Sequence, residues 1–406
     1  MAALRNRLIR RDGAERPALG REPAVSHGPS LLASGAAAYV VILALGALDT
    51  AGYSIIAPVV PAIAEETGEG PAAMGILVSS FAVGMAGGFV LAGRTVQARG
   101  ASFTLALAMA FTAAGAVGFL VGESYVVYFA SRLLMGVGAG GLWIGATFAI
   151  FERFPGQEYR RLTGLLAACS VGGIAGPALG AIGGVRAPFA AYLGLTAVAA
   201  VALAAVSARH ARAVFASDRS ALRRPGFWLA SAGILLVAIG VGTVDGPLPL
   251  HFDERLSQAE IGALYFAASI VLGASAIAAG RLPPRPLLAV GAILIVVGPG
   301  LAGTSESVPM WILALGLAGI GFGLGEAGAI GVLLETIGVE RILLAMVVWS
   351  QIWAVGYLAG PAVGGGVAEA FGFGAVGVVP LAAALVVALA FIRAPRAVPQ
   401  PVRSPS

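Results

Sequence analysis

The segment VGGIAGPALGA at residues 171–181 has a near copy, VGYLAGPAVGG, at residues 355–365. In both segments small residues recur at four-residue spacing around a Gly-Pro pair. Small residues four apart share one face of a helix and let a second backbone approach closely in lipid, and the proline bends that face. The pattern therefore predicts two bent, small-faced helices, built on Gly172, Gly176, Pro177 and Gly180 and on Gly356, Gly360, Pro361 and Gly364.

A second pair of segments matches at almost the same separation, which indicates that the second half of the chain is a diverged copy of the first. The two bent helices are predicted to form the seam along which the halves rock. Tight packing without direct chemistry is the local interpretation of the same glycines, and the two interpretations are compatible. The matched residues of this second pair are Gly136, Gly138 and Glu152, and Gly319, Gly321 and Glu335.

The composition is that of a membrane protein. Of 406 residues, 58% are hydrophobic and 11% are charged, whereas a soluble domain carries about a quarter charged residues. A spanning helix needs about 20 apolar residues, and the hydrophobic runs predict an all-α membrane protein with twelve spans in two groups of six. The predicted spans are 36–60, 73–93, 102–121, 125–150, 162–183, 188–207, 227–250, 260–280, 286–304, 309–334, 342–366 and 373–393.

The arginines predict the orientation in the membrane. All 25 basic residues are arginine, and 22 of them fall in the termini and in the loops on one side. The opposite loops carry only Arg186 and Arg255, beside nine acids. Because arginine and lysine accumulate in cytoplasmic loops, both termini are predicted to be cytoplasmic. The net charge of +5 then reflects topology and predicts no nucleic-acid partner.

The loop SARHARAVFASDRSALRRP, residues 207–225, separates the two groups of spans. The N-terminal tail mixes arginine with acids, proline and glycine, and it lacks the apolar core and cleavage site of a signal peptide. The predicted division is a disordered cytoplasmic tail at 1–35, a six-helix bundle at 36–207, a cytoplasmic linker loop at 208–225, a six-helix bundle at 226–393 and a cytoplasmic tail at 394–406.

Four ionisable residues lie inside the predicted spans, and they are Asp49, Arg132, Asp245 and Glu326. A charged side chain at the centre of a spanning helix costs roughly 2.5 to 3.5 kcal/mol on insertion scales. Such a residue therefore indicates a partner, a water-filled cavity or a function.

Two motifs resemble those of the major facilitator superfamily. The pattern G-x-x-x-G-P-x-x-G at 172–180 resembles the antiporter motif of its proton-coupled drug exporters, and R-x-x-x-G-x-G at 132–138 resembles its span-four motif. The likeness covers residues 36–393. It implies the major facilitator fold, in which spans one, four, seven and ten line a central cavity. All four intramembrane charges would then lie on cavity helices.

Several stretches are similar to the vesicular amine transporter branch and its bacterial drug-exporter relatives. The sequence departs from that branch in span eleven, where Ser350 and Gln351 follow in place of the expected acid. It departs from the superfamily at residues 93–102, where the loop that clamps the outward-facing state keeps the glycines of G-x-x-x-D-R-x-G-R-R but loses the acid and three arginines. The similar stretches are LDTAGYSIIAPVVP (48–61), VDGPLPLHF (244–252), GIGFGLGEAG (319–328) and VGYLAGPAVGGGVAEAFGF (355–373).

Asp49 and Arg132 are interpreted as a proton-sensitive pair. Protonation of the carboxylate would free the arginine and change the field of the cavity, and water entry during opening and closing would move the proton on and off. An ion pair of Arg132 that only joins helices is the alternative. Glu326, in a glycine-rich segment slightly to the cytoplasmic side of the midplane, is counted with the proton-coupling residues.

Three acids against one base make the predicted cavity net negative, which favours a cationic or amine-bearing substrate. Tyr53 follows Asp49 by one helical turn, and aromatic faces attract ammonium groups. For Asp245, near the end of span seven, a carboxylate merely wetted at the helix end is the alternative. The predicted substrate-binding residues are Asp49, Tyr53, Asp245, Glu326, Trp349, Ser350 and Gln351.

These features predict a monomeric secondary transporter of the cell (inner) membrane, which exports small cationic or amphiphilic compounds in exchange for protons by alternating access. Proton-coupled uptake or facilitated diffusion on the same scaffold is one alternative, and a non-transporting membrane sensor is another. An enzyme is not predicted, because the sequence shows no nucleophile with a base, nucleotide loop or metal cluster. Neither a metal nor a cofactor is expected, and the predicted partners are the substrate, protons and the lipid bilayer.

Overall fold

The computed structural model describes residues 29–206, 222–280, 282–337 and 342–393, and within those ranges it contains helices and no strands. Most of the N-terminal tail and linker loop, and all of the C-terminal tail, lie outside the described residues. Helix α2 begins at Pro29, so the last residues of the predicted tail are helical. The helices are α2 (Pro29–Ser54), α3 (Val60–Thr67), α4 (Pro71–Arg99), α5 (Ala101–Val121), α6 (Tyr125–Arg153), α7 (Glu158–Gly180), α8 (Arg186–Val206), α9 (Pro225–Asp245), α10 (Leu248–Asp253), α11 (Gln258–Ala279), α12 (Pro284–Thr304), α13 (Val308–Ile337), α14 (Ile342–Phe371) and α15 (Val378–Arg393), with short 3-10 turns at Ala57–Val59 and Phe373–Ala375.

Eleven helical segments of the described ranges are long and apolar enough to cross a membrane, and α14 is a further helix of 30 residues. One of the segments consists of the 3-10 turn Phe373–Ala375 followed by α15, and two others are interrupted next to a proline. Helices α2 and α3 are joined through a 3-10 turn that contains Pro58, and α9 and α10 are joined through Gly246 and Pro247. Proline lacks the backbone N–H that a continuous helix needs, so the interruptions fall where the sequence supplies it. The predicted all-α fold with twelve spans is confirmed.

The internal duplication is visible in the packing of the two copies. Gly136 of α6 lies against the backbone of α4, and Gly138 lies against α5. Their counterparts Gly319 and Gly321 in α13 lie against α11 and α12. In chain order, span four therefore packs on spans two and three just as span ten packs on spans eight and nine.

The glycine ridges of α7 and α14 pack inside their own halves. Gly172 and Gly176 lie against backbone oxygens of α2, and Gly356 and Gly360 lie against backbone oxygens of α9. A side chain at any of these four glycines would collide with the neighbouring helix. The ridges thus join span five to span one and span eleven to span seven. The glycine ridges themselves therefore serve tight packing inside each half, the local role that the sequence also indicated.

The same two helices nevertheless border the seam through other residues. The carbonyl of Pro361 in α14 approaches Gly75 of α4, and Ser79 of α4 donates a 2.8 Å hydrogen bond to the carbonyl of Leu358. On the other side, Gly262 of α11 lies against the end of α7. Close backbone approach at these glycines brings the two halves together, as small residues allow in lipid.

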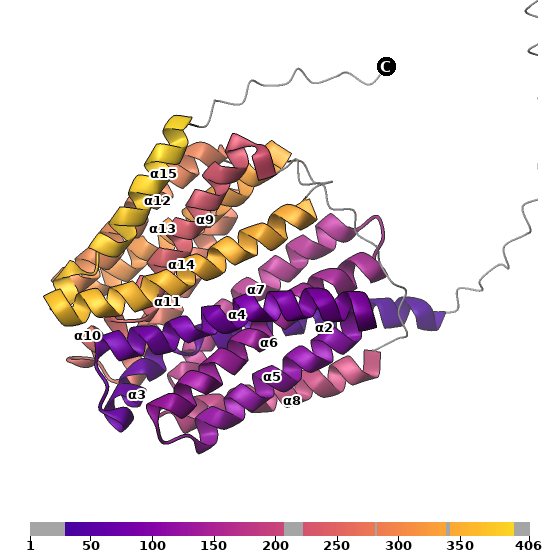
Figure 1. Cartoon of the computed structure of the whole chain (residues 1–406), viewed down its shortest axis with the longest axis horizontal. Coiled ribbons are helices and arrows are strands. Elements are labelled where there is room, and N and C mark those ends of the chain that lie inside the picture. The colour runs from indigo at the N-terminus through magenta and orange to yellow at the C-terminus, as the bar shows by residue number, and fades with distance from the viewer. Residues whose placement is uncertain (1–28, 207–221, 281, 338–341, 394–406) are drawn as a thin grey trace, which may run out of the picture.

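The halves meet at the end of the bundle opposite the two termini. Figure 1 shows α4 and α14 converging at the end that carries α3 and α10, and diverging toward the end from which the C-terminal segment leaves. The backbone contacts between α4 and α14 involve the first turns of α4 and the last turns of α14. This end is called the sealed end below.

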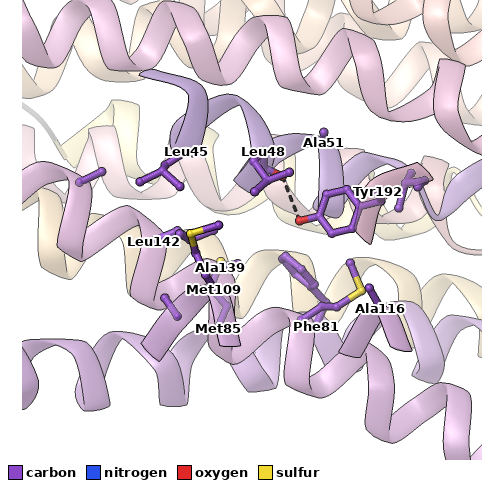
Figure 2. Close-up of a cluster of buried hydrophobic side chains, with 14 of the residues drawn as sticks. Leu45, Leu48, Ala51, Phe81, Met85, Met109, Ala116, Ala139, Leu142 and Tyr192 are labelled. Atoms are coloured by element: carbon purple, nitrogen blue, oxygen red, sulfur yellow. Dashed lines mark hydrogen bonds between the residues drawn. The ribbon is translucent and has the colours of Figure 1, made fainter. Parts of the chain in front are cut away.

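The buried hydrophobic side chains form two clusters, one mainly in each half, and Ala57, Ala238, Ala354 and Tyr357 belong to the cluster of the opposite half. Figure 2 shows part of the core of the first half, where Leu45 and Leu48 of α2 face side chains of α4, α5, α6 and α8. The Tyr192 hydroxyl of α8 donates a 3.1 Å hydrogen bond to the Leu48 carbonyl. Helix α2 is thereby fixed immediately beside Asp49.

The loop predicted between spans two and three is reduced to a single residue. Helix α4 continues to Arg99 and α5 begins at Ala101, with Gly100 between them at a φ of 83°. Positive φ is readily adopted by glycine. The residues that replace the superfamily's charged loop therefore belong mostly to the last turns of α4.

Candidate functional site

Arg132 in α6 is completely buried and binds the backbone of α2. Its Nη1 and Nη2 groups donate 2.7 Å hydrogen bonds to the carbonyls of Gly52 and Tyr53. The guanidinium lies 4.3 Å from the centre of the Phe81 ring of α4, a cation–π arrangement. Arg132 therefore joins α2, α4 and α6 of the first half.

The predicted Asp49–Arg132 ion pair is not present. Within the described ranges no ion pair involves either residue. The guanidinium is held instead by carbonyls three and four residues beyond Asp49, and the carboxylate whose charge acts on it is Asp245. A buried guanidinium is satisfied by strong acceptors in reach, whether or not they carry charge.

Asp245, the last residue of α9, is only 7% exposed, so the alternative of a wetted helix-end carboxylate is wrong. Its Oδ2 atom accepts 3.2 Å hydrogen bonds from the hydroxyls of Tyr53 and Tyr357. Tyr53 belongs to the first half, whereas Asp245 and Tyr357 belong to the second. One carboxylate therefore connects the two halves.

Three aromatic rings surround this connection. The Tyr53 ring centre lies 4.7 Å from that of Tyr357 and 5.4 Å from that of Trp353, and Trp353 stacks on Tyr357 at 5.2 Å. Tyr357 is buried, whereas Tyr53 and Trp353 are half-buried. Together with Phe81 and Arg132, these residues come from five helices. We call the set the sealed layer, and its members are Tyr53, Phe81, Arg132, Asp245, Trp353 and Tyr357.

Asp49 and Glu326 are arranged differently. Both side chains are half-buried, and neither has a hydrogen bond or ion pair to any residue that the structure describes. They come from α2 in the first half and α13 in the second, yet the charges of both act on the thiol of Cys169 in α7. Cys169 is fixed beside α2 by the Thr50 hydroxyl, which donates a 2.6 Å hydrogen bond to its carbonyl. Both acids are therefore within electrostatic reach of one residue of α7, and we call this pair of acids the acid layer.

The three span-eleven residues that were predicted to bind substrate, Trp349, Ser350 and Gln351, lie outside the sealed layer. Trp349 is buried in the core of the second half, and its Nε1 approaches the Ala230 carbonyl at 3.5 Å, so it packs on α9. Ser350 and Gln351 are half-buried. The aromatic residues that reach the sealed layer are Trp353 and Tyr357, one and two turns further along. Four-residue spacing from Trp349 is the signal that links them.

Two side chains of the second half cap helix ends of the first half at the sealed end. The Gln258 amide donates to the carbonyls of Gly180 and Gly184 at 2.7 and 3.0 Å, and accepts from the Gly184 N–H at 2.8 Å. Glu369 accepts a 3.0 Å hydrogen bond from the backbone N–H of Ala72, in the first turn of α4. Unsatisfied backbone groups at helix ends are natural partners for such side chains. Both seams are therefore bridged.

The arrangement suits binding and conformational change rather than bond chemistry. No group of three or more His, Cys, Asp or Glu residues that could hold a metal ion occurs among the residues described. The acid layer offers two carboxylates, one from each half, without a hydrogen bond or ion pair to a described residue. The sealed layer joins the halves through the hydrogen bond between Tyr53 and Asp245.

Comparison with known proteins agrees with this architecture. The family model of the Major Facilitator Superfamily matches residues 42–285 and 230–406. No curated protein sequence gives a significant match. The fold is similar to that of a bacterial homolog to the human lysosomal transporter Spinster. Its inward-facing, occupied form matches with a TM-score of 0.74 at 16% identity, covering 88% of this chain and 96% of that one.

The inward-facing, unoccupied form of that homolog matches with a TM-score of 0.63 at 15% identity, covering 90% of this chain and 96% of the other. Likeness at this identity concerns the fold. The family match spans nearly all of the helical bundle. The chain belongs to the major facilitator superfamily, whose members are membrane transporters, and it is a transporter rather than an enzyme.

Proposed function

We propose that the protein exports small cationic or amphiphilic compounds in exchange for protons. The observation that carries the proposal is the acid layer: Asp49 and Glu326 come from opposite halves, both lie within electrostatic reach of Cys169, and neither has a basic partner among the described residues. A carboxylate at membrane depth is costly unless it binds a cation or a proton. Two such groups favour a positively charged ligand.

The position of Arg132 strengthens this charge argument. Its guanidinium is bound to two carbonyls of α2, and the carboxylate charge that acts on it is that of Asp245. The positive charge of Arg132 therefore compensates the carboxylate of Asp245, in the sealed layer, and not the carboxylates of the acid layer. Both Asp49 and Glu326, and not Glu326 alone, contribute to the negative field that attracts a cation.

Proton coupling follows if substrate and proton compete for the same carboxylates. Alternating access changes which side of the membrane supplies water to the space between the halves. A carboxylate that binds a proton on one side and a cation on the other exchanges the two. The exchange needs no further cofactor.

The direction of export rests on the orientation that the arginines predict. With cytoplasmic termini, the sealed end is extracytoplasmic and the acid layer is loaded from the cytoplasm. We expect a cysteine at Ser217, introduced in a Cys169→Ser background, to react with a membrane-impermeant thiol reagent only after the cells are permeabilised. Labelling of intact cells at Ser217→Cys would reverse the orientation.

Transport itself is tested with purified protein in vesicles that carry an imposed pH gradient. We expect a fluorescent cationic dye to accumulate against its concentration gradient, and the Asp49→Asn/Glu326→Gln double variant to show none of this accumulation. Glu123→Gln is the matched control, because Glu123 is exposed and lies 3.6 Å from Arg186, away from the acid layer.

The other outcomes distinguish the alternatives. Dye equilibration that ignores the pH gradient would identify a facilitator. Accumulation in the opposite direction with respect to the gradient would identify proton-coupled uptake. Absence of transport for every cation and amine tested would contradict the proposal and favour a sensor.

A further inference from the structure

A groove of about 330 Å³ lies between α5 and α8, on the outer side of the first half. Its floor is apolar, and its one polar residue, Thr196, already donates its hydroxyl hydrogen to the Tyr192 carbonyl at 2.9 Å. Exposed valines flank it at positions 117, 198 and 201. The groove therefore opens onto the face that a spanning helix turns to lipid. It is lined by Ala106, Met109, Ala110, Ala113, Leu193, Thr196, Ala197, Ala200, Leu203 and Ala204.

One end of the groove carries two arginines. On the α5 side, Phe103 precedes the lining residue Ala106 by one turn, and the Arg99 guanidinium lies 4.6 Å from the centre of its ring. On the α8 side, Arg153 donates a 3.2 Å hydrogen bond to the carbonyl of Val206, the last residue of the helix. Both walls of the groove therefore end within about one turn of a guanidinium.

These arginines retain hydrogen-bond donors for a ligand. Arg99 is exposed, and Arg153 uses only Nη1 in its bond to Val206. The charge of Glu152 also acts on Arg153 and offsets part of it. A guanidinium has five N–H donors, and its planar shape suits a phosphate group.

We propose that the groove holds one acyl chain of an anionic phospholipid, whose phosphate is bound by Arg99 and Arg153. The apolar groove accounts for the chain, and the two positive charges account for the headgroup. Free phosphate would make no use of the groove, and a zwitterionic lipid would gain less from the arginines. The ligand is a lipid of the leaflet next to the two termini.

Native mass spectrometry of the detergent-solubilised protein tests the proposal with two lipids of equal chain length, phosphatidylglycerol and phosphatidylcholine. We expect tighter binding of phosphatidylglycerol. An arginine near a membrane surface contributes about 1 kcal/mol to the binding of anionic lipid, so Arg99→Gln/Arg153→Gln should weaken that binding about thirtyfold. Each single variant should show a smaller loss. Ala110→Phe, which fills the groove from an exposed position, should reduce the binding of both lipids.

Arg94→Gln is the matched control. Arg94 is an exposed arginine near the same end of α4, and it makes no ring contact or ion pair with a described residue. Thermal unfolding of every variant in lipid-free detergent separates lost binding from lost folding. If Arg94→Gln and Arg99→Gln weaken phosphatidylglycerol binding equally, the attraction is nonspecific and the proposed site is wrong. Unchanged lipid binding in Ala110→Phe, or no preference for phosphatidylglycerol, would overturn the proposal.

Discussion

The sealed layer and the acid layer lie about one helical turn apart on α2, and they differ in the partners of their carboxylates. Asp245 accepts hydrogen bonds from two tyrosine hydroxyls, and the positive charge of Arg132 acts on it. Asp49 and Glu326 have no hydrogen bond to the described residues. Two acids at similar depth can thus differ fully in their partners, and on this ground we propose a structural role for Asp245 and a transport role for Asp49 and Glu326.

The largest effect is expected where the acid layer is broken. Asp49→Asn keeps the shape of the side chain but cannot exchange a proton, so proton-driven accumulation of substrate should fall to background. The protein should still express and unfold at a normal temperature, because no described hydrogen bond of Asp49 is lost. Vesicle uptake with and without a pH gradient provides the measurement. Substrate that Asp49→Asn still concentrates would show that the proton binds elsewhere.

Arg132→Ala tests the sealed layer and should separate the two layers by stability. The change leaves the carbonyls of Gly52 and Tyr53 without their donors and removes the cation that acts on Asp245. Loss of one partner of a buried charge network costs about 3 to 5 kcal/mol. We therefore expect both inactivity and a clearly lower unfolding temperature. A variant that is inactive but as stable as Asp49→Asn would place Arg132 in the coupling machinery.

Glu326→Gln should change selectivity more than turnover. A charge-assisted contact contributes on the order of 1.5 to 3 kcal/mol, or about tenfold to a hundredfold in affinity. Binding of a monocationic substrate should weaken by that factor, whereas binding of a neutral analogue of the same shape should hardly change. Equilibrium titration with both compounds measures the ratio. Equal weakening of both would assign Glu326 a structural role.

The smallest effect is expected from Tyr357→Phe. This variant removes one of the two donors to Asp245 and retains the ring that stacks on Trp353. One buried hydrogen bond contributes about 1 kcal/mol, so the sealed end should open about fivefold more often. Spin-label distances between α4 and α14 at the sealed end measure this population. Tyr265→Phe is the control, because the Tyr265 hydroxyl binds the Val244 carbonyl within the second half. An equal shift in both variants would show that the Asp245 connection does not hold the halves together.

The fold could be predicted from sequence because its determinants are local. Glycines at four-residue spacing fix which helix faces approach closely, and the second copy repeated the pattern. The identity of the neighbour could not be predicted, because it depends on how each helix is rotated in the bundle. Helices α7 and α14 do border the seam, but their glycine ridges pack on α2 and α9, and the spacing alone does not distinguish these two faces.

The site shows the same limit. Asp49, Asp245 and Glu326 could be found because charge is rare in spans, but their partners come from distant parts of the chain. The side chain of Arg132 is long enough to reach more than one turn of α2. Its partners are the carbonyls of Gly52 and Tyr53, about one turn beyond Asp49, and the sequence alone does not show which turn it reaches. The burial of Asp245 depends on Tyr53 and Tyr357, which lie 192 and 112 residues away in sequence.

The side chains of Gln258 and Glu369, which cap backbone groups across the two seams, affect which mutations the protein tolerates. Glu369 and Gln258 bind backbone groups of the opposite half, and backbone groups are present whatever the side chain. At position 72, only proline would delete the N–H that Glu369 accepts from. Each bridge can thus be lost by changing its side-chain donor or acceptor, but hardly by drift on the facing helix. These two bridges therefore depend on the residues at positions 258 and 369 more than on the side chains that face them.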